Sequence, residues 1–119
     1  MASSDFQPVL NFDRPVTIAV GETISTAVDV YGTCIGALIT DANLTGTALT
    51  FLCSDSLNGT YLSYKDLKTG AAAAAVVTTS GYYATAPIDF SFVRFIKVVS
   101  GTIQATADSV VTLVTRRLS

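Results

Sequence analysis

The residues of this chain that could do chemistry are mainly its eight aspartates, because it contains no histidine and a single glutamate. Without histidine, neither a Ser–His nor a Cys–His nucleophile can form, and two cysteines alone do not make a zinc site. Asp55 and Asp66 flank a predicted hairpin and could act as a carboxylate pair. Most aspartates instead fall at expected turns and strand ends, where Asp caps the backbone. The sequence therefore predicts a protein that is not an enzyme, with no metal and no cofactor.

The stretch FLCSDSLNGTYLSY, residues 51–64, predicts a strand, a tight turn and a second strand. Asn58-Gly59 is the strongest short hairpin signal, since a type I′ turn needs positive φ at both central residues. Asp55, Asn58 and Tyr61 at this tip are also residue types that a binding loop uses. We interpret the tip as a corner of a β-scaffold, with the binding loop as the alternative.

Short runs rich in Val, Ile, Thr, Tyr and Phe are separated by Gly, Asn and Asp about every ten residues, which is typical of a β-sandwich or barrel. The alanine run 71–75 is too short to persist as a helix unaided, so we expect a loop that enters a strand. The expected strands are residues 9–19, 23–31, 34–41, 47–54, 60–66, 73–79, 92–100 and 109–117.

About eight strands is the number that a jelly roll uses. The sequence thus predicts an all-β, single-domain antiparallel β-sandwich, jelly-roll-like, over residues 9–119. Residues 1–8 precede it as an extended N-terminal arm. No repeat, linker or second domain is visible along the chain.

The composition indicates a surface that is partly buried against neighbours. Residues of hydrophobic type make up 50% of the chain and only 13% are charged, against about 25% in ordinary soluble domains. Mean hydropathy is +0.51, and so few charges cannot cover the surface of a monomer well. We therefore expect the protein to assemble with copies of itself or with other subunits.

Charge and hydropathy also argue against two classes of partner. The net charge is −2 and no basic patch is visible, so nucleic acid is not the expected partner. The uncharged run from Thr69 to Ile88 lacks the Leu, Ile and Phe density of a membrane-spanning helix. The start MASSDFQP does not resemble a secretion signal, so we expect synthesis in a cytosol. There, Cys34 and Cys53 are expected to be free buried thiols, with a disulfide as the alternative.

The segment FVRFIKVVSG, residues 92–101, places apolar side chains on both faces of a strand, which predicts a strand central to its sheet. Arg94 and Lys97 put a charge on each face, and each must reach water or a carboxylate. We expect structural pairing of Arg94 with Asp66 or Asp89. A ligand-facing Arg94 is the alternative.

Two blocks of the sequence resemble known families. LTFLCSDSLNGTYLSYKD and FVRFIKVVSG resemble strands of discoidin-like and galactose-binding-like sandwiches. The layout of residues 51–70, Pro87 to Phe90, 94–102 and 109–117 is more similar to small structural proteins of tailed bacteriophages, over about the last two thirds of the chain. The chain departs from the sugar-binding pattern because it has no tryptophan.

The phage resemblance implies a head decoration or cement protein at the capsid surface of a virion, made in the host cytoplasm. Its implied partners are the major capsid protein and copies of itself, with a homotrimer favoured. The alternative is a carbohydrate-binding module of a head fibre or tail that contacts the host surface. Its candidate ligand-loop residues are Asn58, Tyr61, Tyr82, Tyr83 and Arg94.

The two ends of the chain supply the remaining candidate contacts. Pro8 biases Gln7 toward an extended conformation, and Phe6 is an aromatic that could fill a groove in a neighbour. We interpret Phe6 and Gln7 as a partner-binding anchor, with a disordered terminus as the alternative. The basic pair Arg116 and Arg117 is either a solvated strand end or a contact to an acidic partner.

Overall fold

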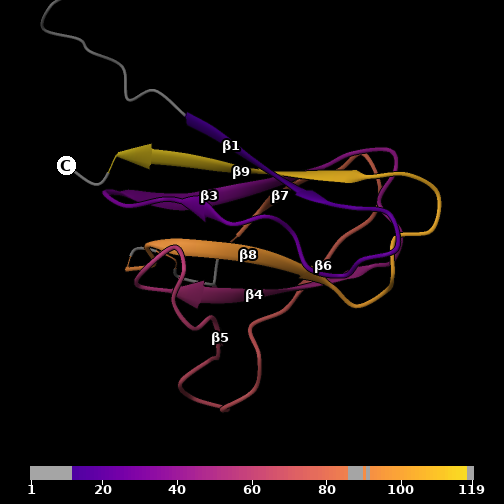
Figure 1. The fold of residues 1–119 in the computed structure, drawn as a ribbon. Coiled ribbons are helices and arrows are strands. Elements are labelled where there is room, and N and C mark those ends of the chain that lie inside the picture. Colours follow the sequence, from indigo (N-terminus) through magenta and orange to yellow (C-terminus); the bar gives the residue numbers. More distant parts are fainter. Residues whose placement is uncertain (1–11, 86–89, 91, 118–119) are drawn as a thin grey trace, which may run out of the picture.

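The structure, a computed structural model, describes residues 12–85, 90 and 92–117, and these form two antiparallel β-sheets packed face to face (Figure 1). The first sheet has the strand order β1-β9-β3-β7 and the second β2-β8-β4-β5, with β6 also paired to β4. None of the described residues forms a helix that is long and apolar enough to cross a membrane. The strands are β1 (Phe12–Ile18), β2 (Val28–Asp29), β3 (Thr33–Thr40), β4 (Ala48–Ser54), β5 (Leu62–Ser63), β6 (Ala75–Val76), β7 (Tyr82–Ala84), β8 (Phe95–Ser100) and β9 (Ser109–Arg117).

The strand pairs are nested, as in a long hairpin that has been rolled up. β1 pairs with β9, β2 with β8, and β3 with β7, while β4 pairs with β5 and β6. The roll is closed sideways because β9 also pairs with β3, and β8 also pairs with β4. This strand order is that of a jelly roll, so the predicted all-β sandwich is confirmed.

The core follows from the two-residue alternation of the longest strands. In β9, Val111 and Leu113 are fully buried between the sheets, whereas Val110 and Thr112 face outward and are half-buried. In β8, Ile96 and Val98 are fully buried and Lys97 lies on the outer face. The prediction of a central strand in 92–101 is therefore confirmed, although the strand begins at Phe95.

Three expected strands are much shorter in the structure, among them the one expected at 73–79, of which only β6 forms, and one observed strand was not expected. The strand expected at 23–31 is reduced to β2 and an isolated bridge between Ile24 and Val99. The strand expected at 60–66 is reduced to β5, and β7 was not expected at all. A strand of two or three residues is too short to show an alternation, and β2 and β7 are bonded to partners far away in the sequence.

The tip of the β4–β5 hairpin is wider than predicted. Residues 54–61 separate the strand pair Cys53–Leu62, and the Gly59 N–H donates to the Ser56 carbonyl at 3.1 Å. Neither Asn58 nor Gly59 has a positive φ, so the predicted type I′ turn is wrong. The hydroxyl of Tyr61 donates to the Leu57 carbonyl at 2.9 Å and supports this longer loop instead.

The free edge of β1 is unsuited to pairing with another chain. The N–H and C=O of Thr17 point away from β9, because both bond to Thr26, at 3.2 and 3.0 Å. Pro15 has the same orientation two residues earlier, so the open edge lacks an N–H at that position. Asp13 adds a charge on this strand, another device that discourages strand addition. Association therefore has to use side chains rather than a shared ladder at this edge.

The side chain of Gln104 joins the loop that contains Thr45 to the loop that contains Thr102. It is only 1% exposed. Its Oε1 accepts the Thr45 N–H at 2.8 Å, and its Nε2 donates to the carbonyls of Thr45 and Thr102 at 3.0 and 3.1 Å. The side chain thus satisfies part-buried backbone groups that have no strand partner. The Ser100 hydroxyl also lies within hydrogen-bond distance of both carbonyls, at 3.2 and 2.8 Å.

We predict that Gln104→Met lowers the free energy of unfolding by about 1–3 kcal/mol, since it keeps the volume but leaves the Thr45 N–H without its partner. Urea denaturation followed by circular dichroism measures the change. Thr106→Ala, at an exposed position of the same loop, is the control and should be within about 0.5 kcal/mol of the parent. Equal stability of the two variants would contradict this role for Gln104.

Candidate functional site

The corner between β2 and β3 is held by a tight turn. The Thr33 N–H and hydroxyl both donate to the Val30 carbonyl, at 3.1 and 2.6 Å. Gly32 has φ +75° at the third position of this turn, where a type II turn needs a positive value. The Val30 N–H donates to the Arg94 carbonyl at 2.7 Å and ties the corner to the start of β8.

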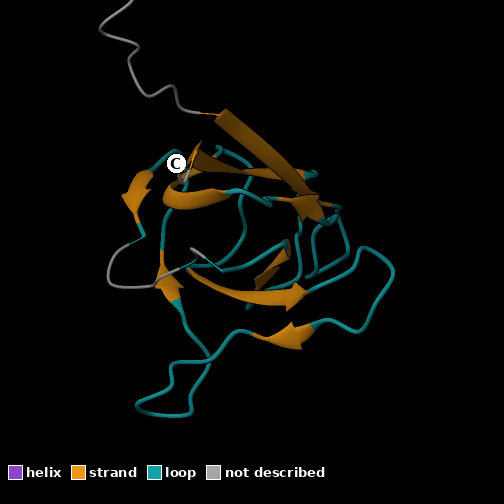
Figure 2. Ribbon diagram, turned by 90° about the vertical axis from the view of Figure 1, so that its left-hand side faces the viewer, coloured by secondary structure: helices purple, strands orange, loops and turns teal. Residues whose placement is uncertain are grey.

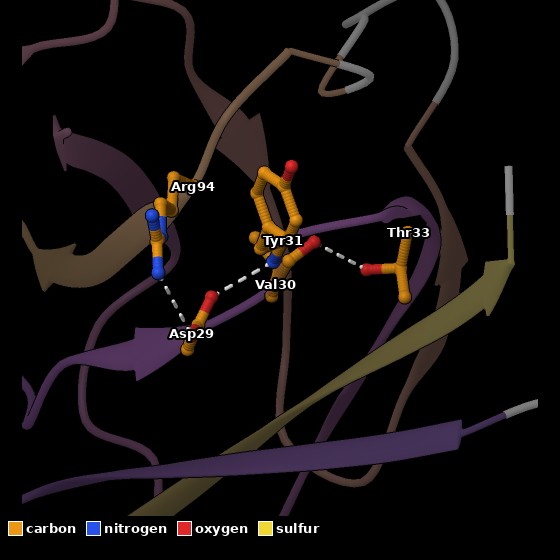
Figure 3. Close-up of polar contacts among 5 residues, drawn as sticks. All are labelled: Asp29, Val30, Tyr31, Thr33 and Arg94. Carbon is orange, nitrogen blue, oxygen red and sulfur yellow. Dashed lines mark hydrogen bonds and ion pairs between the residues drawn. The ribbon is translucent and has the colours of Figure 1, made fainter.

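This corner places Asp29 and Tyr31 beside the side chain of Arg94 (Figure 3). The Arg94 guanidinium carbon lies 4.8 Å from the ring centre of Tyr31 and 5.0 Å from that of Phe95. One Asp29 oxygen is 3.9 Å from an Arg94 nitrogen, and the other accepts the Tyr31 N–H at 2.9 Å. The result is a cation held between a carboxylate and aromatic rings on the protein surface.

The ion pair leaves Arg94 able to bind a partner. The side chains of Arg94 and Asp29 are 47% and 49% exposed, and a long ion pair in water contributes only about 0–1 kcal/mol. The predicted pairing with Asp66 is not seen. Asp29 lies opposite Phe95 in the neighbouring strand, whereas the Asp66 carboxylate accepts the Lys68 N–H at 2.8 Å in another loop. Asp89 lies outside the described residues.

A groove of about 340 Å³ lies next to Arg94. Leu62 and Phe92 line it, and their side chains are 67% and 97% exposed. Tyr31, on the Arg94 side chain, is 72% exposed. We call Tyr31, Leu62, Phe92 and Arg94 together the Arg94 surface. Three exposed large apolar side chains thus lie around one exposed cation, an arrangement that is found at interaction sites.

A second cation lies over an aromatic ring on the same sheet. The Lys97 ammonium is 4.3 Å from the ring centre of Tyr61. Partial desolvation raises the pKa of the Tyr61 hydroxyl above its ordinary value, so it remains the protonated donor to Leu57. Tyr61 contacts Lys97 of β8, and Arg94 directly precedes β8. These two expected ligand-loop residues therefore lie beside the same strand. Asn58 lies nearby, in the exposed tip of the hairpin.

The other two expected ligand-loop residues lie in the first sheet, on β7. Tyr83 is half-buried, and its hydroxyl accepts the Thr78 N–H at 2.8 Å. This bond gives Tyr83 a structural role. Tyr82 is 67% exposed and pairs with Ile39 in the sheet. The structure therefore divides the expected set between two sheets.

The expected terminal contacts lie partly beyond the described part of the chain. Phe6 and Gln7 are outside it. Arg116 and Arg117 are exposed at the end of β9, with the Arg117 guanidinium 5.9 Å from the ring centre of Phe12. Both arginines are thus on a strand end, as either of the two interpretations requires.

Asp55 and Asp66, which could act as a carboxylate pair, are not brought together. Asp55 lines the groove beside Arg94, whereas Asp66 lines a separate cavity near β6. Among the residues that the structure describes, no three His, Cys, Asp or Glu side chains are grouped so that they could hold a metal ion.

Both cysteines are free, as predicted, but they are half-buried rather than buried. Cys34 lies on β3 and Cys53 on β4, in different sheets. Burial raises the pKa of the Cys53 thiol to about 11. Cys53 therefore contributes to the wall of the groove as a neutral, weakly reactive group.

Comparison with family models, with curated proteins and with solved structures finds no match to this chain. The functional argument therefore depends on the Arg94 surface itself. Sequence reasoning singled out Arg94 but missed Asp29 and Tyr31. Their only sequence signal is DVYGT, in which Gly32 predicts a turn that brings its flanking residues to a corner.

We predict that Cys53 alkylates slowly, and we propose Cys34→Ser to isolate it. Because the thiolate is the nucleophile, the rate with iodoacetamide should keep rising about tenfold per pH unit above pH 9 and level off near pH 11. The unfolded chain loses this proton at a lower pH than the folded chain. The thiol therefore stabilises the fold below about pH 9, and that contribution is lost toward pH 11. A rate plateau near pH 9 would contradict the raised pKa.

Proposed function

We propose that this chain is a non-enzymatic structural protein of a bacteriophage virion, a decoration or cement protein that bridges and stabilises neighbouring capsid subunits. The observation that carries the proposal is the Arg94 surface. Tyr, Phe and Arg are the residues enriched in the cores of protein interfaces. Phe92 and Tyr31 are 97% and 72% exposed, so their contact area is still available to a partner. A half-exposed guanidinium beside them favours an acidic group on that partner.

The fold and composition support a binding role of this kind. Jelly rolls occur in viral capsid proteins and in lectins. This fold-level analogy supports a binding role. With 13% charged residues, the chain has little charge with which to repel neighbours. Because Pro15 blocks strand addition at the β1 edge, docking at that edge has to use side chains.

The mechanism is repeated weak attachment. A capsid presents the same site many times by symmetry, so copies that also contact one another, with a trimer favoured, bind with avidity. The partners are the major capsid protein and the protein itself, and the location is the capsid surface after synthesis in the host cytoplasm. The proposed anchor of Phe6 and Gln7 would add a second contact to the same neighbours.

The test is Phe92→Ser, measured by co-sedimentation with capsids that lack this protein. We expect binding to weaken by tenfold or more, since an aromatic at the centre of an interface contributes on the order of 2 kcal/mol. Leu67→Ser is the matched control, because Leu67 is 99% exposed in the connection between β5 and β6, which projects from the body of the sandwich (Figure 2).

Leu67→Ser should bind as the parent does. Equal losses in both variants would mean that exposed apolar side chains act without a defined site. Parent-like binding by Phe92→Ser would reject the Arg94 surface as the capsid contact, and no binding by the parent would reject the proposal.

A second function, carbohydrate binding at the host surface, is favoured by one observation. Tyr31 presents an exposed ring next to a guanidinium and a carboxylate, and these groups together can stack on a sugar and hydrogen-bond its hydroxyls. Saturable binding on a glycan array that is abolished by Tyr31→Ala, and kept by the control Tyr82→Ala, would establish this function. If no glycan on the array binds, carbohydrate binding is excluded for the sugars that the array carries.

A further inference from the structure

A second hollow, of about 900 Å³, leads from the surface to the core on the side of β6 and β7. Leu38, Phe51 and Phe90 lie beneath its floor and are 2%, 1% and 1% exposed, so other side chains already cover them. The Phe90 ring packs edge-on against Phe51 at 5.0 Å and stacks on Tyr64 at 5.2 Å. The aromatic side chains that remain partly accessible in this hollow are Tyr64 and Tyr83, which are half-buried.

The alanine run of the sequence forms one wall of this cavity. Ala72, Ala73, Ala74 and Ala75 all line it. Ala73 and Ala75 are half-buried, and the run continues to the fully buried Val77, so every second residue points inward. Ala75 pairs with Leu49, and the Ala73 N–H donates to the Tyr64 carbonyl at 2.9 Å. The backbone is thus fixed by hydrogen bonds, and methyl side chains leave the space beside it open.

The mouth of the cavity carries more positive than negative charge. Lys65, Asp66 and Lys68 line it, in a chain whose net charge is −2. The Asp66 carboxylate already accepts the Lys68 N–H. Neither lysine side chain has an ion-pair partner among the described residues, so both can receive an anion.

We propose that this cavity binds a small amphiphile of the fatty-acid class, with its hydrocarbon body against Tyr64, Tyr83 and the alanines. Its carboxylate lies at Lys65 and Lys68. The volume is in the range of about 300–1,000 Å³ that ligand sites occupy. This inference does not depend on the proposed function, because the cavity does not include Tyr31, Phe92 or Arg94.

The probe is laurate below its micelle concentration, titrated into protein whose alanine methyl groups carry ¹³C. We expect saturable methyl shifts at Ala73 and Ala75 and none at Ala42 and Ala105, which do not line the cavity. Dodecanol, which has the same chain without the charge, should bind about tenfold more weakly. Lys65→Gln combined with Lys68→Gln should remove that difference while leaving the buried core unchanged.

Ala73→Phe should fill the cavity and abolish binding of both probes. The lysine variant does not touch the core, so the proposal stays testable if Ala73→Phe fails to fold. Saturable binding that follows this pattern supports the site. Shifts spread over all alanines, or no shift at the cavity alanines, would overturn it. A cavity that binds neither probe while Ala73→Phe raises the melting temperature would likewise overturn it, as a packing void.

Discussion

The whole structure depends on the pairing of β9 with both β1 and β3. This strand joins the two ends of the chain, which are separated by most of the sequence. Its inward residues Val111 and Leu113 are fully buried, so the first sheet and the core form together. Without β9 the nested pairs cannot close into a roll, and β1 would leave the first sheet.

The same pairing decides which residues meet at the candidate site. The nested arrangement brings the start of β1, the end of β9, the end of β4 and the start of β8 to one end of the sandwich (Figure 1). The corner from β2 to β3 crosses between the sheets at this end. Arg94, Tyr31 and Leu62 are far apart in sequence, and they become one surface only because the roll closes.

Much of the fold could be predicted because its main strands alternate clearly. The run 109–117 was expected and observed with the same bounds, and the two faces of 95–99 follow from the sequence alone. Strand β7 could not be predicted, since its three residues form a strand only through β3. The turn at Asn58-Gly59 was predicted wrongly, because bonds from Tyr61 and Ser54 stabilise a wider loop than the two-residue signal implies.

The candidate site was less predictable than the fold. Arg94 could be singled out because it is a charge in an apolar segment. Its carboxylate partner, Asp29, lies on β2, and the sequence pattern does not predict that β2 pairs with β8. Tyr31 is exposed by a turn at Gly32, and no periodicity distinguishes an exposed aromatic from a core one. The alanine run was predicted correctly as a loop that enters a strand. That it lines a cavity depends on the tertiary structure, which the sequence pattern does not give.

The most direct test of the central claim, that the Arg94 surface is the docking surface, is hydroxyl-radical footprinting of the free and the capsid-bound protein. The free protein should be oxidised at Tyr31, Leu62 and Phe92, three exposed apolar side chains at this end. Bound to capsids, these three should be protected, while Leu67 and Ile103 elsewhere on the surface stay reactive. Protection of Leu67 or Ile103, with Tyr31 and Phe92 still oxidised, would contradict the account.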